Sequence, residues 1–283
     1  MLPRHRNHST RISRISIVGY TDRVNTHAAD FKPAWWLPGP HAQTLGARFL
    51  RPKPPLPYRR ERWTTPDGDF LDLDFVESRG LRSDALVLLL HGLEGSAASG
   101  YILEIARRLS DRGIAAVALN FRSCSGELNR GRRLYHSGET TDPAWVIGRL
   151  HERKPGLRLA AVGISLGGNV LLKYLGEGGR ESRLEAAAAW SVPFDLAAGA
   201  RLKDRGVPRR YVGRQLRSLK AKERARRDEL GPFIDLDRTL NATSFWEFDD
   251  AATAPLHGFD GADDYYRRSS SAGFLPAIST PTL

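Results

Sequence analysis

The sequence predicts an α/β protein built on a doubly wound, mostly parallel sheet. Three observations support this prediction. The chain has short apolar runs, it has helical patterns between them, and a glycine or a proline stands at several of the boundaries between a run and a helix. The runs are continuous rather than alternating, which is typical of strands buried on both faces of a parallel sheet. Four such runs are expected to be strands: 85–90, 115–119, 157–164 and 186–192. Helical patterns over 101–112, 144–153 and 166–175 lie between them, so strands and helices alternate with right-handed crossovers.

Two segments depart from this alternation. Arg59–Thr65 and Phe70–Val76, joined by Pro66-Asp67-Gly68, predict a β-hairpin that precedes the parallel strands. From Asp195 to about Pro255 a basic, helix-prone stretch runs into an aromatic and acidic patch. We interpret residues 195–255 as a helical cap inserted into one domain that spans 31–283. Residues 1–30 are expected to form a basic, disordered arm.

The positive charge is concentrated in two places. The chain of 283 residues has 43 Lys and Arg against 32 Asp and Glu, a formal charge of +11, and its 41% apolar content excludes general disorder. Residues 201–230 hold twelve basic and four acidic residues, or +8, and residues 1–30 contribute +3. Segment 201–227 is interpreted either as the solvated face of a cap helix or as a patch that docks on anionic lipid headgroups. Because no nucleic-acid motif accompanies the charge, no nucleic-acid partner is expected.

The sequence also excludes several classes of site. Cys124 is the single cysteine, so there is no internal disulfide and no multi-cysteine metal site, and a packed thiol is the simplest interpretation. No metal-ligand spacing, dinucleotide fingerprint or phosphate loop is present, so no cofactor or metal is expected. The longest aliphatic run, 85–90, is far shorter than the roughly 20 residues of a spanning helix. Since residues 1–30 also lack an apolar leader segment, we expect a cytoplasmic protein, with peripheral membrane contact as an open option.

The pattern G-x-S-x-G at Gly163–Gly167 lies between a predicted buried strand and a predicted helix. A strained strand-to-helix turn leaves room only for glycines beside the serine and exposes its hydroxyl at a helix N-terminus. Ser165 is therefore the candidate nucleophile. The five-residue pattern is weak alone, and a glycine-rich turn with an incidental serine is the alternative.

His91–Ser96 directly follows the strand that ends at Leu90. In a hydrolase of this architecture that loop gives a backbone N–H to the oxyanion, and the residue after the nucleophile gives another. The expected donors are the amides of Leu93, or of its neighbour Gly92, and of Leu166. His91 opens this loop, so it is interpreted as a structural hydrogen-bonding residue and not as the catalytic base.

Taken together, the motifs resemble the YheT-type branch (AB hydrolase 4 family) of the α/β-hydrolases over residues 31–283. This resemblance implies an α/β-hydrolase fold and a serine hydrolase that acts on carboxylic esters, with lipid-like acyl substrates in eukaryotic members. Ser123 stands where the family usually has glycine. The matching segments are Phe31–Leu37, His91–Ser96, Asn120–Glu127, Tyr135–Thr140, Gly163–Asn169, Thr253–Phe259 and Asp264–Tyr266.

The expected triad order is serine, acid, histidine, with the acid and the histidine on loops after late strands. Residues 281–283 look like the start of the strand that leads to the acid, so we expect a C-terminally truncated chain that lacks the last strands. An improvised triad of Ser165, Asp195 or Asp250, and His257 preserves the order, although His257 matches a non-triad position. The hypothesis is a serine esterase that works through an acyl-enzyme. Its rival is a catalytically dead fragment or a binding-only module.

Overall fold

The computed structural model describes residues 34–37, 39, 42, 43, 46, 53–79, 84–203 and 208–283, with the backbone alone at 208–212. The predicted arm at 1–30 lies outside the described residues. All elements below belong to one compact unit, residues 51–283.

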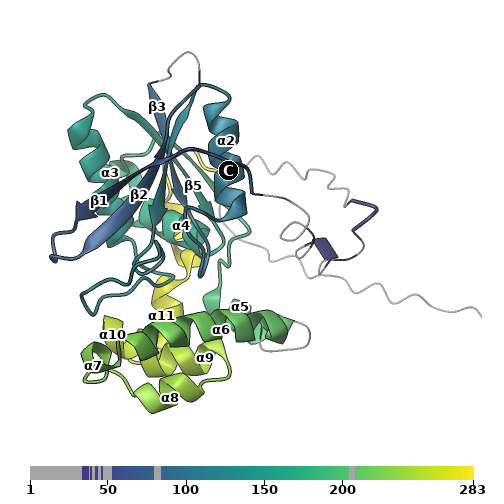
Figure 1. Cartoon of the computed structure of the whole chain (residues 1–283), viewed down its shortest axis with the longest axis vertical. Helices are drawn as coiled ribbons and strands as arrows, with labels where there is room; N and C mark the ends of the chain where they lie inside the picture. The colour runs from purple at the N-terminus through teal and green to yellow at the C-terminus, as the bar shows by residue number, and fades with distance from the viewer. Residues whose placement is uncertain are drawn as a thin grey trace, which may run out of the picture. The chain divides into compact units, whose positions relative to one another are not determined.

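In the part of the chain that the structure describes, six strands form one sheet in the order β1-β2-β4-β3-β5-β6 (Figure 1). β1 and β2 form the predicted antiparallel hairpin, and β2 also pairs antiparallel with β4. The other four strands are parallel, which confirms the predicted fold class. The strands are β1 (Arg59–Thr64), β2 (Phe70–Val76), β3 (Ala85–Leu90), β4 (Ala115–Asn120), β5 (Arg158–Ile164) and β6 (Ala186–Trp190).

Helices cover both faces of the sheet, as the continuous apolar runs require. α2 (Gly100–Ser110) packs on the face that includes Val87 and Leu89. α3 (Thr141–Arg153) and α4 (Leu166–Gly178) pack on the opposite face with Leu88 and Leu90. Successive side chains of a strand point to opposite faces, so one apolar run supplies both cores.

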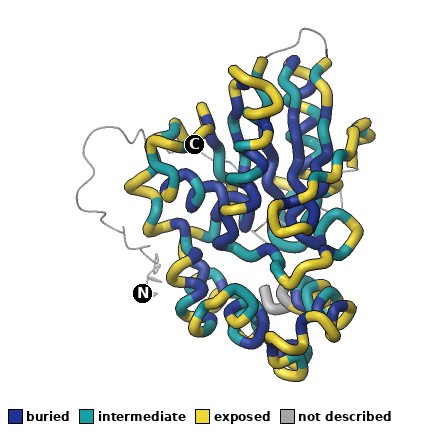
Figure 2. The backbone as a smooth tube through the Cα atoms, turned by 90° about the vertical axis from the view of Figure 1, so that its left-hand side faces the viewer, coloured by how far each residue is buried: buried dark blue, intermediate teal, exposed yellow. Residues whose placement is uncertain are grey.

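A helical layer, which we define as residues 196–269, lies beyond the loops that follow the parallel strands (Figure 1). It has an apolar core of its own, in which Leu216, Phe245 and Tyr265 are buried. Figure 2 shows dark blue, buried stretches of backbone within the layer. The boundaries predicted for the cap, 195–255, stay a prediction. The elements of the layer are α5 (Leu196–Lys203), α6 (Pro208–Ala225), α7 (Arg227–Leu230), α8 (Leu236–Asn241), α9 (Phe245–Phe248), a π-helical turn (Asp249–Thr253), α10 (Ala254–His257) and α11 (Ala262–Ser269).

Several basic side chains of segment 201–230 form hydrogen bonds within the fold. Lys220 donates to the carbonyl of Ala242 within the layer. Arg226, which is 4% exposed, donates to the Gly131 carbonyl at 2.5 Å and so ties the layer to a loop of the sheet domain. The exposed arginines with described side chains are Arg201, Arg214, Arg217, Arg224 and Arg227. The solvated face is therefore less basic than the sequence count suggests.

The last described residues return to the sheet. A 3-10 helix, Ser271–Ala277, packs against α4, and Pro281–Leu283 then runs parallel to β6. The amide of Ala187 donates to the carbonyl of Pro281 at 2.9 Å, and the amide of Leu283 donates to the carbonyl of Ala187 at 3.0 Å. The structure has an isolated parallel bridge between Thr282 and Ala187 at this place, and the strand predicted to begin at residue 281 stays a prediction. The prediction that further strands are missing stays a prediction.

Candidate active site

Ser165 occupies a strained turn between β5 and α4. Its backbone has φ 54° and ψ −117°, a conformation that costs a non-glycine residue about 1–3 kcal/mol. The amide of Ser165 donates to the Trp190 carbonyl at 2.8 Å, which anchors the turn to the end of β6. The predicted strand–turn–helix context of Ser165 is confirmed.

Two glycines make this turn possible because the backbone on both sides is too close for a side chain. A Cβ on Gly167 would lie 2.4 Å from the carbonyl oxygen of Leu90, and one on Gly163 would lie 2.4 Å from that of Gly167. The beginning of α4 is therefore pressed against the end of β3. This contact brings the loop after β3 next to Ser165, whose Cβ would lie 3.2 Å from a Cβ built on Gly92.

The loop after β3 leaves one amide for a ligand. The amide of Gly92 donates to the Tyr101 hydroxyl, and that of Glu94 donates to the Tyr135 hydroxyl, both at 2.9 Å. The amide of Gly95 donates to the Gly92 carbonyl at 2.9 Å. The amide of Leu93 has no partner among the described residues. Of the two alternatives at this position, Leu93 therefore fits an oxyanion donor and Gly92 does not.

Leu166 is the first residue of α4, where backbone amides have no carbonyl partner within the helix. The positive end of the helix dipole also favours negative charge at this place. Leu93, Ser165 and Leu166 all line one cavity, as the sequence-based hypothesis requires. Their catalytic roles stay predictions.

His91 is fully buried, and both of its ring nitrogens are occupied. Nδ1 lies 2.8 Å from the Gly92 carbonyl, and the Phe121 amide donates to Nε2 at 3.1 Å. This pattern fits a neutral ring that donates through Nδ1 and accepts at Nε2. Burial lowers its pKa to about 4, so the structure supports a structural role for His91.

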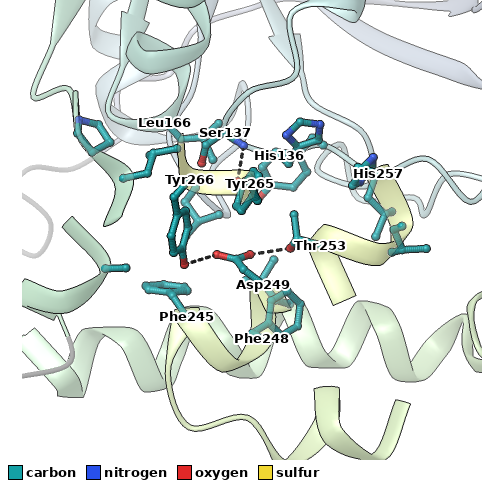
Figure 3. Close-up of a pocket in the computed structure, with 18 of the residues that line it drawn as sticks. His136, Ser137, Leu166, Phe245, Phe248, Asp249, Thr253, His257, Tyr265 and Tyr266 are labelled. Carbon is teal, nitrogen blue, oxygen red and sulfur yellow. Dashed lines mark hydrogen bonds between the residues drawn. The ribbon is translucent and has the colours of Figure 1, made fainter. Parts of the chain in front are cut away.

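The cavity lies between the sheet domain and the helical layer and measures about 100 Å³ (Figure 3). The loops that follow β3, β4, β5 and β6 line it on the side of the sheet domain. Apolar side chains of the layer form much of its wall: Leu196, Leu219, Phe245, Phe248 and Leu256.

Two histidines share this cavity with Ser165. The rings of His136 and His257 are 4.4 Å apart between centroids, and Figure 3 shows the two side by side. Burial lowers the pKa of His136 to about 3 and that of His257 to about 4, so both are neutral at pH 7. Among the described residues, no hydrogen bond joins the Ser165 hydroxyl to either ring.

The acids considered for an improvised triad lie elsewhere. Asp195 and Asp250 line a second cavity that includes neither Ser165 nor His257. Asp195 accepts the Ala198 amide at 2.9 Å at the start of α5. Asp250 accepts the Ala262 amide at 2.9 Å and pairs with Arg238 at 2.6 Å. Both carboxylates therefore serve the helical layer, and the structure does not assemble this triad.

Sequence reasoning missed Asp249, which lines the first cavity. It accepts hydrogen bonds from Thr253 at 2.6 Å and Tyr266 at 2.7 Å (Figure 3). Burial raises its pKa to about 6. The sequence signal was the aromatic and acidic run Phe245–Asp250, which holds three acids and does not mark which of them lines a cavity. Within the described ranges no cluster of three or more candidate ligands could hold a metal ion.

The comparisons with known proteins place the chain in a family. YheT of Escherichia coli is 37% identical over 260 residues, which cover 90% of this chain and 76% of that protein. The chain belongs to the YheT-type branch of the α/β-hydrolases. This confirms the resemblance that the sequence motifs indicated. No protein-family model matches the chain.

More distant relatives extend the comparison. Phospholipase ABHD3 of Mus musculus is 31% identical over 89% of this chain and 63% of its own length. Monoacylglycerol lipase of Saccharomyces cerevisiae is 27% identical over 80% of this chain. The chain matches only 50% of the length of that lipase. The chain therefore spans roughly half to three quarters of the length of these relatives.

Replacing Gly167 with alanine tests the close contact at the turn. Because the new Cβ would meet backbone atoms, we expect Gly167→Ala to lower the free energy of unfolding by about 2–3 kcal/mol. The matched control is Gly213→Ala on the exposed side of α6, where a Cβ meets nothing within 4 Å. This control should raise stability by about 0.5–1 kcal/mol. Urea unfolding measures both, and equal effects would contradict the proposed steric constraint.

The burial of His91 predicts a pH dependence of stability. The unfolded chain, with a histidine pKa of about 6.5, binds more protons than the folded chain between pH 6.5 and 4. Lowering the pH through this window therefore destabilises the fold, by at most about 1.4 kcal/mol per pH unit from this residue. His136 and His257 act in the same direction, and Asp249 acts in the opposite direction.

The variant His91→Gln isolates the contribution of His91. It should show a flatter dependence of unfolding free energy on pH between 6.5 and 4 than the wild type. NMR of the His91 imidazole gives an independent readout, with no titration expected above pH 5. A midpoint near 6.5 would overturn the assignment.

Proposed function

We propose that this chain is a serine hydrolase of carboxylic esters, with Ser165 as the nucleophile. One observation carries the proposal: the strained turn holds Ser165 beside an unpartnered loop amide and a helix N-terminus in a cavity with an apolar wall. Those are three of the parts that acyl transfer uses beside a base, namely a nucleophile, oxyanion donors and room for an acyl chain.

The proposed reaction runs through an acyl-enzyme. The Ser165 hydroxyl attacks the ester carbonyl carbon and loses its proton to a base. The amides of Leu93 and Leu166 stabilise the resulting oxyanion. The protonated base returns its proton to the departing alkoxide, which leaves as an alcohol, and water then hydrolyses the acyl-enzyme to release the carboxylic acid. His136 and His257 are the described imidazoles in the cavity, but burial makes both weak bases.

The relatives and the cavity together suggest the substrate. One relative is named a phospholipase and another a monoacylglycerol lipase, which favours lipid-like acyl esters for this chain as well. A cavity of about 100 Å³ is smaller than the roughly 150 Å³ that accommodates benzene, so it favours short acyl chains.

An activity series tests the nucleophile and the chain length together. We expect p-nitrophenyl acetate and butyrate to be hydrolysed faster than the palmitate ester. Ser165→Ala should lower kcat/KM by at least about 10³-fold, since it removes the nucleophile. A fluorophosphonate probe should label the wild type and not the variant. Unchanged turnover in Ser165→Ala would remove Ser165 from the mechanism.

A second candidate function is a binding-only module, and a specific observation favours it. Among the residues that the structure describes, the Ser165 hydroxyl has no hydrogen bond to a base, and a serine without a base is a poor nucleophile at neutral pH. Under this alternative the fluorophosphonate probe fails to label the chain. Binding of a non-hydrolysable short-chain ether would still be detectable by calorimetry.

The exposed arginines of segment 201–227 support docking on an anionic lipid surface. Arg214, Arg217, Arg224 and Arg227 are exposed, and each contributes about 1 kcal/mol near such a surface. No helix in the described residues is long and apolar enough to cross a bilayer.

Flotation with liposomes tests this docking. We expect recovery with vesicles that contain phosphatidylserine and not with neutral vesicles. The pair Arg214→Glu and Arg217→Glu should abolish the difference. A matched control reverses the same number of charges at Arg112 and Arg149, which are exposed on the sheet domain. Equal binding to both kinds of vesicle would overturn the electrostatic interpretation.

A further inference from the structure

Three side-chain donors converge on the carboxylate of Glu94, in the loop after β3. The Tyr135 hydroxyl donates to Oε1 at 2.7 Å, and Lys222 Nζ donates to the same oxygen at 2.6 Å. The Ser218 hydroxyl donates to Oε2. Ser218 and Lys222 lie one turn apart on α6, so the helical layer binds Glu94, which is adjacent to Leu93.

The pair of Glu94 and Lys222 is well shielded from water, whereas Ser218 at its edge is exposed. The Glu94 side chain is 8% exposed and that of Lys222 is 18% exposed. Ion pairs at such sites are screened less than surface pairs, and loss of one partner leaves a buried charge. Lys222 also lies 5.5 Å from the centre of the Tyr135 ring, and its Nζ is 3.5 Å from Cys124 Sγ.

The backbone of Glu94 needs such support. Its φ of 53° is a left-handed conformation that favours glycine, and Gly92–Gly95 forms a tight turn closed by a 2.9 Å hydrogen bond. A conformation of this kind persists only where surrounding contacts hold it. Here those contacts are the Tyr135 hydroxyl, which accepts the Glu94 amide and donates to its carboxylate, and the two donors from α6.

Leu93 lies where the two apolar cores meet. Its side chain packs against the core beneath the sheet and also against the core of the helical layer. Its amide, the one left unpartnered in the turn, is fixed by the same turn geometry. A movement of α6 would therefore be transmitted to this amide through both Leu93 and Glu94.

We propose that Lys222 and Glu94 form a latch through which α6 holds the turn at Leu93 in the geometry that receives the oxyanion. Both are positioning residues that act through the Leu93 amide. The inference rests on the proposed hydrolase function. It makes the helical layer a part of the oxyanion site in addition to a wall of the cavity.

The key variants are Lys222→Met and Glu94→Gln, which remove a charge and keep most of the side-chain volume. The matched control is Lys220→Met, since Lys220 lies on the same helix and donates to a carbonyl inside the layer. We expect both latch variants to lower kcat for p-nitrophenyl butyrate about tenfold with little change in KM. Loss of a whole oxyanion donor costs about 10²–10³-fold, so a displaced donor should cost less. Lys222→Arg keeps the positive charge and should therefore retain most of the wild-type kcat.

Hydrogen exchange measured by mass spectrometry gives a readout that does not depend on turnover. Exchange of the peptide covering 92–96 should accelerate in both latch variants and remain at the wild-type rate in Lys220→Met. The double variant Glu94→Gln, Lys222→Met should match the single variants, because the two residues act through one contact. Affinity for a trifluoromethyl ketone, which forms a tetrahedral oxyanion, should fall in parallel with kcat.

The outcomes separate the two proposals. Absent turnover and absent fluorophosphonate labelling in the wild type would overturn the hydrolase function, whereas exchange at 92–96 would still decide whether α6 holds the turn. If the wild type is active, unchanged kcat and exchange in Lys222→Met would overturn the latch. A raised KM with unchanged exchange would mean that Lys222 contacts substrate directly, which also contradicts a positioning role.

Discussion

The arrangement of this site depends on one close contact between backbones, where α4 begins against the end of β3. Gly167 sits so near the carbonyls of Leu90 and His91 that any side chain would clash. Because of this contact, the two loops that follow β3 and β5 meet side by side. Ser165, Leu93 and Leu166 come from different segments of the chain, and this packing brings them into one cavity.

The positive charge of the chain has more than one use. The sequence concentrates it in segment 201–230, and from the sequence alone this charge would be interpreted as a binding surface. In the structure, Lys220, Lys222 and Arg226 instead tie α6 and its neighbour to carbonyl and carboxylate groups within the fold. The basic residues on one face of α6 thus hold the helix in the fold, and the arginines on its other face remain in solvent.

The fold was predictable from the sequence because its signals are local. Continuous apolar runs located β3 to β6, and the hairpin and the turn at Ser165 follow from residues adjacent in the chain. The pairs that build the site are far apart in sequence and leave no such signal. Lys222 and Glu94 are separated by 128 residues, and the residue type at either position does not reveal the other. Asp249 was missed for the same reason, since its partners become evident only when the π-helical turn and α11 pack together.

The helical layer shares its core and several polar contacts with the sheet domain, and this limits how it can move. Leu93 and Leu134 pack into it, the Ser137 amide donates to the Tyr265 hydroxyl at 2.9 Å, and Asn169 donates to the Ser269 carbonyl at 2.7 Å. Lifting the whole layer as a rigid lid would break these contacts at once and expose apolar surface to water. A local shift of a single helix therefore costs less free energy than a hinge motion of the layer as one body.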